Sequence, residues 1–389
     1  QGCCRRRGQG MITIKDISRE SGYAVGTVSR VLNGHPNVSD TARAAILEVV
    51  QRYNFSPNSN ARQLKQRNSD CVAILVKGVG NLLFVGMLEK LQQRFQQVNR
   101  ATSVFYMDES DDELAHALRI FREFKPVGIF FLGGSPTQFI PRFQEIDLPC
   151  ILVSTPGSPL NYPNLSSVST DDAAGTRSAM GYLLDLGHRR VGIIGGLYCN
   201  RIRPDGLKDM SRLRLEGCMQ ACGERNIPFD PVAQTEETFY SISGGYEAAN
   251  RLLDRVPGLT ALLAMSDVTA IGAVRAIRDR GLRVPEDVSV IGFDGIELSQ
   301  YLTPRLTTVW QDTDRMAQRA VEILLSQLDG GQPAVHEIVP CRLIEGESVR
   351  DISHLPQTCV RGGAHDKRTC SFVTTSGVWM HISPLPSPP

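Results

Sequence analysis

The chain has 389 residues, which is long enough for more than one domain, and its formal net charge is only +1. This charge excludes a uniformly basic protein, so a nucleic-acid surface would need a local excess of Lys and Arg. The segment from Met11 to Arg67 has that excess, with eight basic against four acidic residues, a local net charge of +4. A solvated helical surface is the alternative interpretation. No apolar run approaches the ~20 residues of a membrane-spanning helix.

The N-terminal residues and the cysteine spacing also bear on the class of protein. Arg5, Arg6 and Arg7 are not followed by an apolar stretch, so we do not expect secretion. The ten cysteines include no CxxC pair, which favours scattered free thiols in a reducing cytoplasm. Residues 1–10 show no periodicity, and Met11 begins the first recognisable element. We expect residues 1–10 to be a non-native or disordered extension; a basic arm that touches the DNA backbone is the alternative.

Two short amphipathic helices are predicted between Ile12 and Leu32, with a break at Gly22. Ile14 and Ile17 supply the apolar side of the first helix, and the second has apolar residues at i, i+3 and i+4. The opposite face of the second helix carries residues spaced by three and four: Val25, Gly26, Ser29, Arg30 and Asn33. Such a face suits the DNA major groove, where Arg binds guanine edges and Ser or Asn reaches bases or phosphates. A plain helical hairpin is the alternative.

A third helix and a linker follow. Ser39 is a suitable cap for a helix whose inward face we predict to be Ile46, Val49, Val50 and Tyr53. The predicted three-helix headpiece covers residues 11–56. In residues 57–69 Pro57 prevents helix continuation, while Ala61 and Leu64 lie on one side of a short helix that would be marginal alone. An ordinary interdomain linker is the other interpretation of this segment.

From Cys71 onward, buried strands alternate with amphipathic helices, which predicts two doubly wound parallel sheets. The strands are CVAILV, TSVFYM, VGIFFL, CILVS, VGIIG, ALLAM and VSVIGFD. The helices between them are predicted around 88–95, 113–124, 139–146, 176–186, 212–225, 244–254 and 268–280. The fold class is therefore an all-α helix-turn-helix headpiece followed by an α/β core, residues 70–352.

Ligands of such sheets bind beyond the carboxyl ends of the strands. Asp294 follows VSVIGF, Ser266 and Asp267 follow ALLAM, and Phe84 is expected in the loop after CVAILV. Carboxylates and an aromatic face suit a polyol ligand, because the carboxylates accept hydrogen bonds from hydroxyls and the ring packs on the apolar side of a sugar. For both Asp171 and Asp267, capping of the helix that follows is the alternative interpretation.

Several strings resemble the lactose-repressor/galactose-repressor (LacI/GalR) family of bacterial transcription regulators. In the headpiece the string is TVSRVLNG, Thr27 to Gly34, after Ile14-Lys15-Asp16-Ile17. In the body the strings are LGHRRVGIIGG, LRVPEDVSVIGFDG and TPRLTTVWQD. The resemblance implies a periplasmic-binding-protein-like core with two subdomains and chain crossings near His188, Gln311 and Gly330. Subdomain one would then cover about 70–188 and 311–330, and subdomain two about 189–310 and 331–352.

The resemblance also implies functional residues. The DNA-binding set is Thr13, Val25, Gly26, Thr27, Ser29, Arg30, Asn33, Asn58, Ala61 and Leu64, the last three in a hinge helix that inserts a leucine into the minor groove. The effector-binding set is Phe84, Asp171, Arg214, Tyr240, Ser266 and Asp294. The sequence departs from the family at Ala24, where a capping Ser is usual, and at Gly26, where a base-reading side chain is common. Specificity then depends on Ser29, Arg30 and DNA shape.

We therefore expect a sequence-specific DNA-binding transcriptional repressor that reads a palindromic operator as a homodimer and responds to a small sugar-like effector. We expect no enzymatic activity, cofactor or metal. A solute-binding module with a weakened headpiece is one alternative; a Rossmann-type enzyme is another, although Gly192 to Gly196 lacks GxGxxG spacing. Residues 353–389 are predicted to be a disordered or aberrant tail, with a metal site at Cys359, His365 and Cys370 as the minor alternative.

Overall fold

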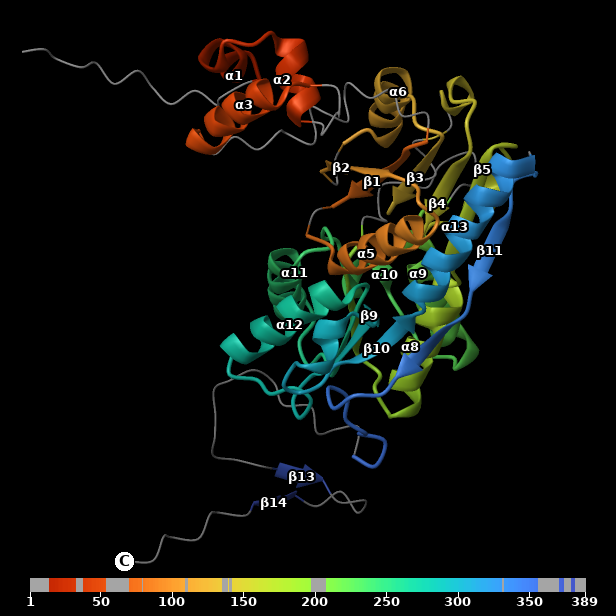
Figure 1. The fold of residues 1–389 in the computed structure, drawn as a ribbon. Helices are drawn as coiled ribbons and strands as arrows, with labels where there is room; N and C mark the ends of the chain where they lie inside the picture. The colour runs from red at the N-terminus through yellow and green to blue at the C-terminus, as the bar shows by residue number, and fades with distance from the viewer. Residues whose placement is uncertain are drawn as a thin grey trace, which may run out of the picture. The chain divides into compact units, whose positions relative to one another are not determined.

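The computed structural model divides the chain into two compact units, residues 1–69 and residues 70–389. The residues that it describes are 14–32, 38–53, 70–78, 80–108, 111–134, 139, 142–196, 208–330, 332–355, 371–373 and 379–381. Each unit has its own hydrophobic core. The units are therefore described separately (Figure 1).

In the described part of the first unit, three helices surround a small apolar core. They are α1 (Ile14–Ser21), α2 (Val25–Leu32) and α3 (Asp40–Arg52). The fully buried side chains come from all three helices: Ile17, Val28, Val31, Ile46 and Val49. Ser39 caps α3 as predicted, because its side chain accepts a hydrogen bond from the Ala42 amide. Tyr53 was expected in this core, but it follows the last turn of α3 and is 38% exposed.

The described part of the second unit contains two six-stranded sheets and one two-stranded sheet. In the first sheet, sheet A, every pairing is parallel and the order is β11-β5-β4-β3-β1-β2. Its strands are β1 (Val72–Lys77), β2 (Thr102–Met107), β3 (Gly128–Leu132), β4 (Cys150–Val153), β5 (Leu165–Thr170) and β11 (His336–Val339). Parallel sheets of this kind need a helical layer on both faces.

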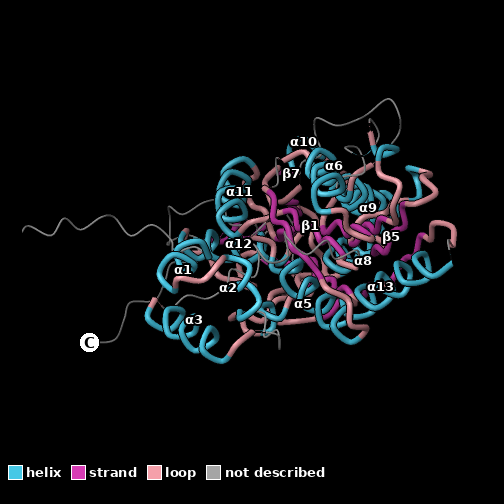
Figure 2. Tube along the Cα trace, turned by 45° about the horizontal axis from the view of Figure 1, so that its top comes forward, coloured by secondary structure: helices cyan, strands magenta, loops and turns pink. Residues whose placement is uncertain are grey.

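Helices cover both faces of sheet A (Figure 2). On one face lie α5 (Leu82–Gln97) and α13 (Thr313–Gly330), which pack on the side chains of Val72, Ile74 and Phe130. On the other face lies α6 (Glu113–Phe124), whose apolar side packs on Ala73, Leu75 and Phe131. Alternate residues of β1 thus enter two different cores, as strand geometry requires.

Sheet B has the order β12-β10-β9-β8-β6-β7, and only its β12 edge strand is antiparallel. Its strands are β6 (Val191–Ile194), β7 (Thr235–Glu236), β8 (Ala261–Ala264), β9 (Ser289–Asp294), β10 (Thr307–Gln311) and β12 (Cys341–Ile344). The helices around it are α8 (Asp172–Asp185), α9 (Met210–Glu224), α10 (Pro231–Gln234), α11 (Ile242–Arg255) and α12 (Asp267–Asp279).

Two of the predicted chain crossings lie elsewhere. The first occurs between β5 and α8 rather than near His188, because Met180 and Leu183 of α8 are buried with α9 and β6 under sheet B. The last occurs between β11 and β12 rather than near Gly330, because β11 pairs with β5 in sheet A and β12 pairs with β10. Subdomain one therefore loses α8 and gains β11 relative to the prediction.

The range 139–146, predicted to be a helix, contains helical Phe139 and a 3₁₀ turn, Phe143–Glu145, whose Phe143 is buried against Phe139 and Tyr162. Residues 140 and 141 lie outside the described residues. In the tail, predicted to be a disordered or aberrant extension, β13 (Ser371–Val373) and β14 (Trp379–His381) form an antiparallel pair. Cys359, His365 and Cys370 lie outside the described residues.

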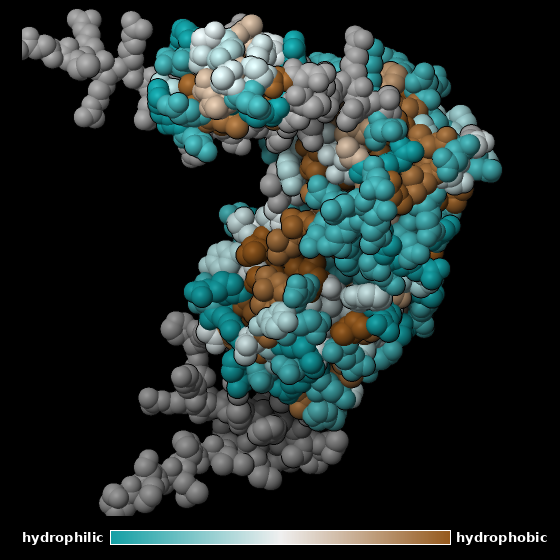
Figure 3. All heavy atoms as spheres, viewed as in Figure 1, coloured by the Kyte–Doolittle hydropathy of each residue, from teal (hydrophilic) through white to brown (hydrophobic). Residues whose placement is uncertain are grey.

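Apolar side chains reach the surface over the N-terminal part of α5 (Figure 3). Leu82 is 39% exposed and Val85 is 52% exposed. Both belong to the first turns of a helix whose other side packs in the core of sheet A. A contiguous apolar patch on a folded domain is typical of a surface that meets another protein chain. No helix in the described part of the chain is long and apolar enough to cross a bilayer.

Candidate functional site

The outward face of α2 is the first candidate site. Val25 is 40% exposed, and Gly26 and Arg30 are exposed as well, while Val28 and Val31 are buried against the other headpiece helices. Thr27 is half-buried. Helical spacing therefore turns Val25, Gly26 and Arg30 away from the core, as the sequence predicts. A short helix with an exposed Arg on this face has the shape and charge that a major groove accepts.

The start of α2 lacks a side-chain cap. The Ala24 carbonyl accepts hydrogen bonds from the Thr27 amide (2.8 Å) and the Val28 amide (3.1 Å), which makes Ala24 the capping residue. Alanine has no side-chain oxygen to satisfy another amide of the first turn. The turn before it depends on Gly22, which has φ +74° and ends α1. The helix-turn-helix geometry thus forms without the usual cap.

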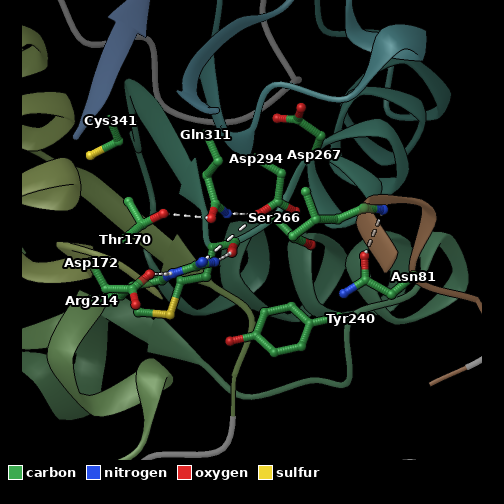
Figure 4. A network of polar contacts seen from close by, with 12 residues as sticks. Asn81, Thr170, Asp172, Arg214, Tyr240, Ser266, Asp267, Asp294, Gln311 and Cys341 are labelled. Carbon is green, nitrogen blue, oxygen red and sulfur yellow. Dashed lines mark hydrogen bonds and ion pairs between the residues drawn. The ribbon is translucent and has the colours of Figure 1, made fainter. Parts of the chain in front are cut away.

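The second candidate site is a polar network at the carboxyl ends of four strands (Figure 4). Thr170 ends β5, Asp294 ends β9 and Gln311 ends β10, while Ser266 and Asp267 follow β8. Asp172 begins α8, and Arg214 projects from the second turn of α9. This is the edge at which open parallel sheets bind ligands, and residues from both sheets contribute to it.

Arg214 lies at the centre of this network and is only 1% exposed. Its Nε donates a hydrogen bond to Asp172 Oδ1 at 2.7 Å, and its Nη1 donates to the Met265 carbonyl. Its Nη2 lies 3.7 Å from Asp294 Oδ1, and the guanidinium stacks on the Phe293 ring with Cζ 3.7 Å from the centroid. Buried charges need such partners, because an isolated buried cation is very unfavourable.

Asp294 is held in a strained position. Its Oδ1 accepts a hydrogen bond of 2.8 Å from Gln311 Nε2, and its backbone has φ +119°, a region that L residues rarely adopt. Such a conformation costs about 1–3 kcal/mol and occurs mainly at functional sites. Burial raises the pKa of Asp294 to about 7, although Arg214 and the Gln311 hydrogen bond act to lower it.

Two further buried carboxylates, Asp267 and Asp172, interact electrostatically with Asp294. Asp267 accepts hydrogen bonds from Thr308 Oγ1 (2.6 Å) and the Ile296 amide (2.9 Å), and burial followed by the Asp294 charge raises its pKa well above the usual range. Burial also raises the pKa of Asp172, against the opposing effect of Arg214. The Oδ2 atom of Asp172 is buried and has no hydrogen-bond partner within the described structure. A buried acceptor without a donor is a feature that a ligand hydroxyl would satisfy.

Comparison with known proteins places the two sites in a single family. Residues 13–58 match the model of bacterial regulatory proteins of the lacI family, and residues 180–349 match a periplasmic-binding-protein-like domain. The chain is 33% identical over 352 residues to the transcriptional regulator MalR of Clostridium butyricum, an alignment that covers 88% of this chain and 100% of MalR. The chain belongs to the lacI family of bacterial regulatory proteins. It is therefore a DNA-binding transcriptional regulator.

Other members of the lacI family share its length and fold. The ribose operon repressor of Haemophilus influenzae is 31% identical over 324 residues, which cover 82% of this chain and 92% of that repressor. A solved complex of the transcriptional regulator CelR with cellobiose has a TM-score of 0.63 and 25% identity, covering 87% of this chain and 99% of CelR. A lac repressor dimer bound to operator and an anti-inducer has a TM-score of 0.61 and 25% identity. The match covers 87% of this chain and 98% of the lac repressor chain.

The structure brings together only part of the predicted effector set. Arg214 and Asp294 meet in the network, and Ser266, which is buried, caps α12 through the Thr269 amide at 3.3 Å. Tyr240 is half-buried, and its hydroxyl lies 2.9 Å from Ser211 Oγ. Burial raises the pKa of Tyr240 to about 12, so the phenol stays protonated beside Arg214. Figure 4 shows its ring beside the guanidinium of Arg214.

The other two predicted effector residues are placed differently. Asp171 is exposed and caps α8 through the Ala174 amide at 2.9 Å, and it is Asp172 that joins the network. Phe84 does not lie in a loop: Asn81 caps α5 and so starts the helix before Phe84, which is buried against Gly133. Asp172, Gln311 and Thr170 were not predicted. The paired Asp171-Asp172 after a strand was the available signal for the first of these.

Some predicted DNA-binding residues cannot be placed. Thr13, Asn33, Asn58, Ala61 and Leu64 lie outside the described residues, and the side chain of Ser29 does as well. Within the described ranges, no group of three His, Cys, Asp or Glu side chains could hold a metal ion. The buried thiols of Cys150 and Cys218 have pKa values raised by burial, so they stay protonated and unreactive.

Proposed function

We propose that this regulator is a repressor that binds a palindromic operator as a homodimer and is controlled by a small sugar-like effector. The observation that carries the proposal is the buried Asp172–Arg214–Asp294 network at the strand ends, in a chain that also exposes a recognition helix. The CelR and lac repressor structures support it, since the first is a complex with cellobiose and the second is a dimer bound to operator and an anti-inducer. The family headpiece alone reads only a half-site, so two copies are needed.

The DNA contacts in this proposal come from the exposed face of α2. Arg30 donates to a guanine edge or a phosphate, while Val25 and Gly26 allow close approach and supply apolar contacts. Ser29, Thr27, Thr13 and Asn33 complete the major-groove set, and Asn58, Ala61 and Leu64 form the minor-groove hinge. With few base-reading side chains on α2, part of the specificity comes from DNA shape.

The effector contacts come from the strand-end network. Arg214, Asp294 and the free oxygen of Asp172 bind ligand hydroxyls, and Tyr240 packs on the apolar side of a sugar ring. Ser266 and Gln311 support this arrangement from β8 and β10. Because residues of both sheets surround the ligand, its binding favours one relative arrangement of the two sheets over another. This change is transmitted to the headpieces through the dimer.

Dimerisation in this proposal uses the apolar patch on α5. Leu82 and Val85 are exposed there, and covering them in a second copy removes apolar area from water. The lac repressor relative is described as a dimer on its operator. We expect Val85→Glu to shift the chain toward monomer in sedimentation experiments and to reduce operator affinity, since half-site binding loses the second headpiece.

The test is selection of bound sites by the full chain from a pool of random duplex DNA, repeated with a panel of sugars. The proposal predicts an enriched palindrome with half-sites about one helical turn apart and an occupancy that one sugar changes. Arg30→Ala should lower the affinity for the operator and relax the base preference at one position of it. Arg275→Ala removes an equal charge from an exposed position of α12 and should have neither effect. No enriched site together with sugar binding would indicate a solute-binding module instead.

A further inference from the structure

Arg214 is already neutralised by the protein before any effector binds. Asp172 forms a hydrogen-bonded ion pair with its Nε at 2.7 Å, and Asp294 lies 3.7 Å from its Nη2. The Met265 carbonyl accepts from Nη1. An arginine that recognises a carboxylate or a phosphate normally presents two free N–H groups side by side. In Arg214, Nε and one N–H of Nη1 already donate to the protein, and an anion at the remaining N–H groups would lie beside the carboxylates of Asp172 and Asp294.

The stacking of Arg214 leaves little freedom to change this arrangement. Its guanidinium lies on the Phe293 ring with Cζ 3.7 Å from the centroid, and the residue is 1% exposed. Rotating the Arg214 guanidinium toward an anion would break the ion pair with Asp172. The Asp172 carboxylate would then be buried without its cation, which is strongly unfavourable. Nη2 can still donate to a neutral oxygen. Arg214 can thus donate to an uncharged ligand without bringing a second anion close to Asp172 and Asp294.

The rest of the network adds acceptors and negative charge. Asp172 Oδ2 is buried and has no hydrogen-bond partner within the described residues. Burial raises the pKa of both Asp294 and Asp267, and a neighbouring carboxylate raises each further, Asp172 for Asp294 and Asp294 for Asp267. A buried site that already holds several carboxylates opposes further negative charge. An additional anion would meet this opposition, whereas a hydroxyl donor would relieve it.

From this geometry, and resting on the effector role proposed above, we infer that the site selects an uncharged polyhydroxyl ligand and excludes its anionic counterpart. The excluded class comprises sugar acids and sugar phosphates. Selection comes from an arginine whose charge is already neutralised by Asp172 and Asp294, and from an unsatisfied carboxylate oxygen, rather than from the size of the site. Discrimination of this kind depends on unfavourable interactions with the wrong ligand.

The experiment compares neutral and anionic members of matched pairs on the full chain. Glucose is paired with glucuronate, ribose with ribose 5-phosphate, and cellobiose with cellobionate, and inorganic phosphate serves as the simplest anion. Calorimetry and thermal denaturation are run at about pH 8, where Asp294, with a pKa of about 7, is ionised. We expect no anionic member to bind the wild-type chain as tightly as its neutral partner. An anionic member that binds more tightly would overturn the inference.

The variant Asp172→Asn makes the test independent of which sugar binds. It keeps the shape of the side chain but removes the charge that neutralises Arg214, so anions including phosphate should gain affinity on the order of tenfold. The matched control is Asp171→Asn, which removes the same charge from the exposed neighbouring residue and should leave phosphate binding unchanged. No gain in Asp172→Asn, or an equal gain in both variants, would contradict the inference. Operator selection is measured separately, so a failure of the proposed function would be recognised as such.

Discussion

The hydroxyl of Thr170 donates a hydrogen bond of 2.8 Å to Gln311 Oε1, and this bond joins the last residue of β5 to the last residue of β10. The two strands belong to different sheets. The amide nitrogen of the same Gln311 donates to Asp294. The bond therefore links the place where the chain passes between the sheets to the residue that we propose binds the effector.

We expect Gln311→Ala to weaken the response of operator binding to effector. The substitution removes both bonds of the side chain and leaves Thr170 Oγ1 and Asp294 Oδ1 without this partner, at a cost of about 1–3 kcal/mol for each buried group. Effector affinity should fall at least tenfold, and the effector should change operator affinity less than in the wild-type chain. Calorimetry and operator titration with and without effector measure the two quantities.

Gln318→Ala is the control for this substitution. Gln318 lies on the exposed side of α13 and bonds only to Glu322 at 2.9 Å within the described structure. It should leave effector affinity and the operator response unchanged. Thr170→Val, which removes the bond between the sheets but keeps the Gln311–Asp294 bond, should reduce the operator response more than the effector affinity. Equal loss of both quantities would contradict a linking role for Thr170.

Effector affinity should increase with pH through about 7, because the pKa of Asp294 is raised to about 7. Below that pH the carboxyl is protonated and loses acceptor capacity toward ligand hydroxyls; above it the carboxylate is restored. The groups that face Asp294 are Arg214, Asp172 and Asp267, and burial raises the pKa of both aspartates as well. Calorimetry of a neutral sugar should show affinity changing by at most about tenfold per pH unit below 7.

Asp294→Asn tests the assignment of this pH dependence. The variant should bind the sugar more weakly and with a flatter pH profile between pH 6 and 8, because the titrating group is absent. A profile that keeps the wild-type slope in Asp294→Asn would assign the dependence to another group. Asp171→Asn, at the exposed cap of α8, should keep the wild-type profile.

The sequence was sufficient to predict the alternation of elements but not the position of the first crossing. Strand β5, with the sequence LSSVST, was not among the predicted strands, and all three of its serines are buried. Ser166 Oγ accepts from Gln327 Nε2 and from the Val335 amide, each at 3.0 Å, and Ser167 Oγ lies 2.9 Å from His336 Nδ1. Their partners are more than 160 residues away in the chain. Local periodicity cannot identify such a strand.

The residues of the candidate site were likewise predicted only in part. Arg214 and Asp294 were identified from the family resemblance, and the structure places them 3.7 Å apart. The choice between Asp171 and Asp172 depends on which residue caps α8, because adjacent residues of a helix start point in different directions. Gln311 joins the site only through pairings of β10 with β9 and β12, which have no local sequence signal.

Stability of the core should fall as the pH decreases from about 6.5 to about 4, because His188 is buried as the neutral imidazole. Its ring nitrogens lie 3.0 Å from Thr260 Oγ1 and 3.0 Å from the Arg350 carbonyl oxygen, and burial lowers its pKa to about 4. The unfolded chain takes up a proton near pH 6.5, so the stabilising contribution is complete above that value and is lost toward pH 4. The gap between the two pKa values corresponds to about 3 kcal/mol.

Urea denaturation of the wild-type chain and of His188→Gln at several pH values isolates this contribution. Glutamine can keep a hydrogen bond but does not titrate, so the difference in unfolding free energy between the two chains should shrink as the pH falls from 6.5 to 4. His116→Gln, at a half-buried position of α6 where the ring Nδ1 lies 3.1 Å from the Asp112 carbonyl oxygen, is the matched histidine variant. A constant difference between wild type and His188→Gln would mean that His188 does not titrate in this range.

The recognition helix should be stabilised by restoring the residue types that it lacks. Ala24→Ser supplies a side-chain acceptor to the first turn of α2, a gain of about 0.5–2 kcal/mol. Gly26→Ala adds a Cβ that meets no atom within 4 Å, and alanine is favoured over glycine in a helix by about 1 kcal/mol. Gly22→Ala is the opposite control, because φ +74° disfavours any side chain there. Hydrogen exchange of the α2 amides in the full chain should slow in the first two variants and accelerate in the third.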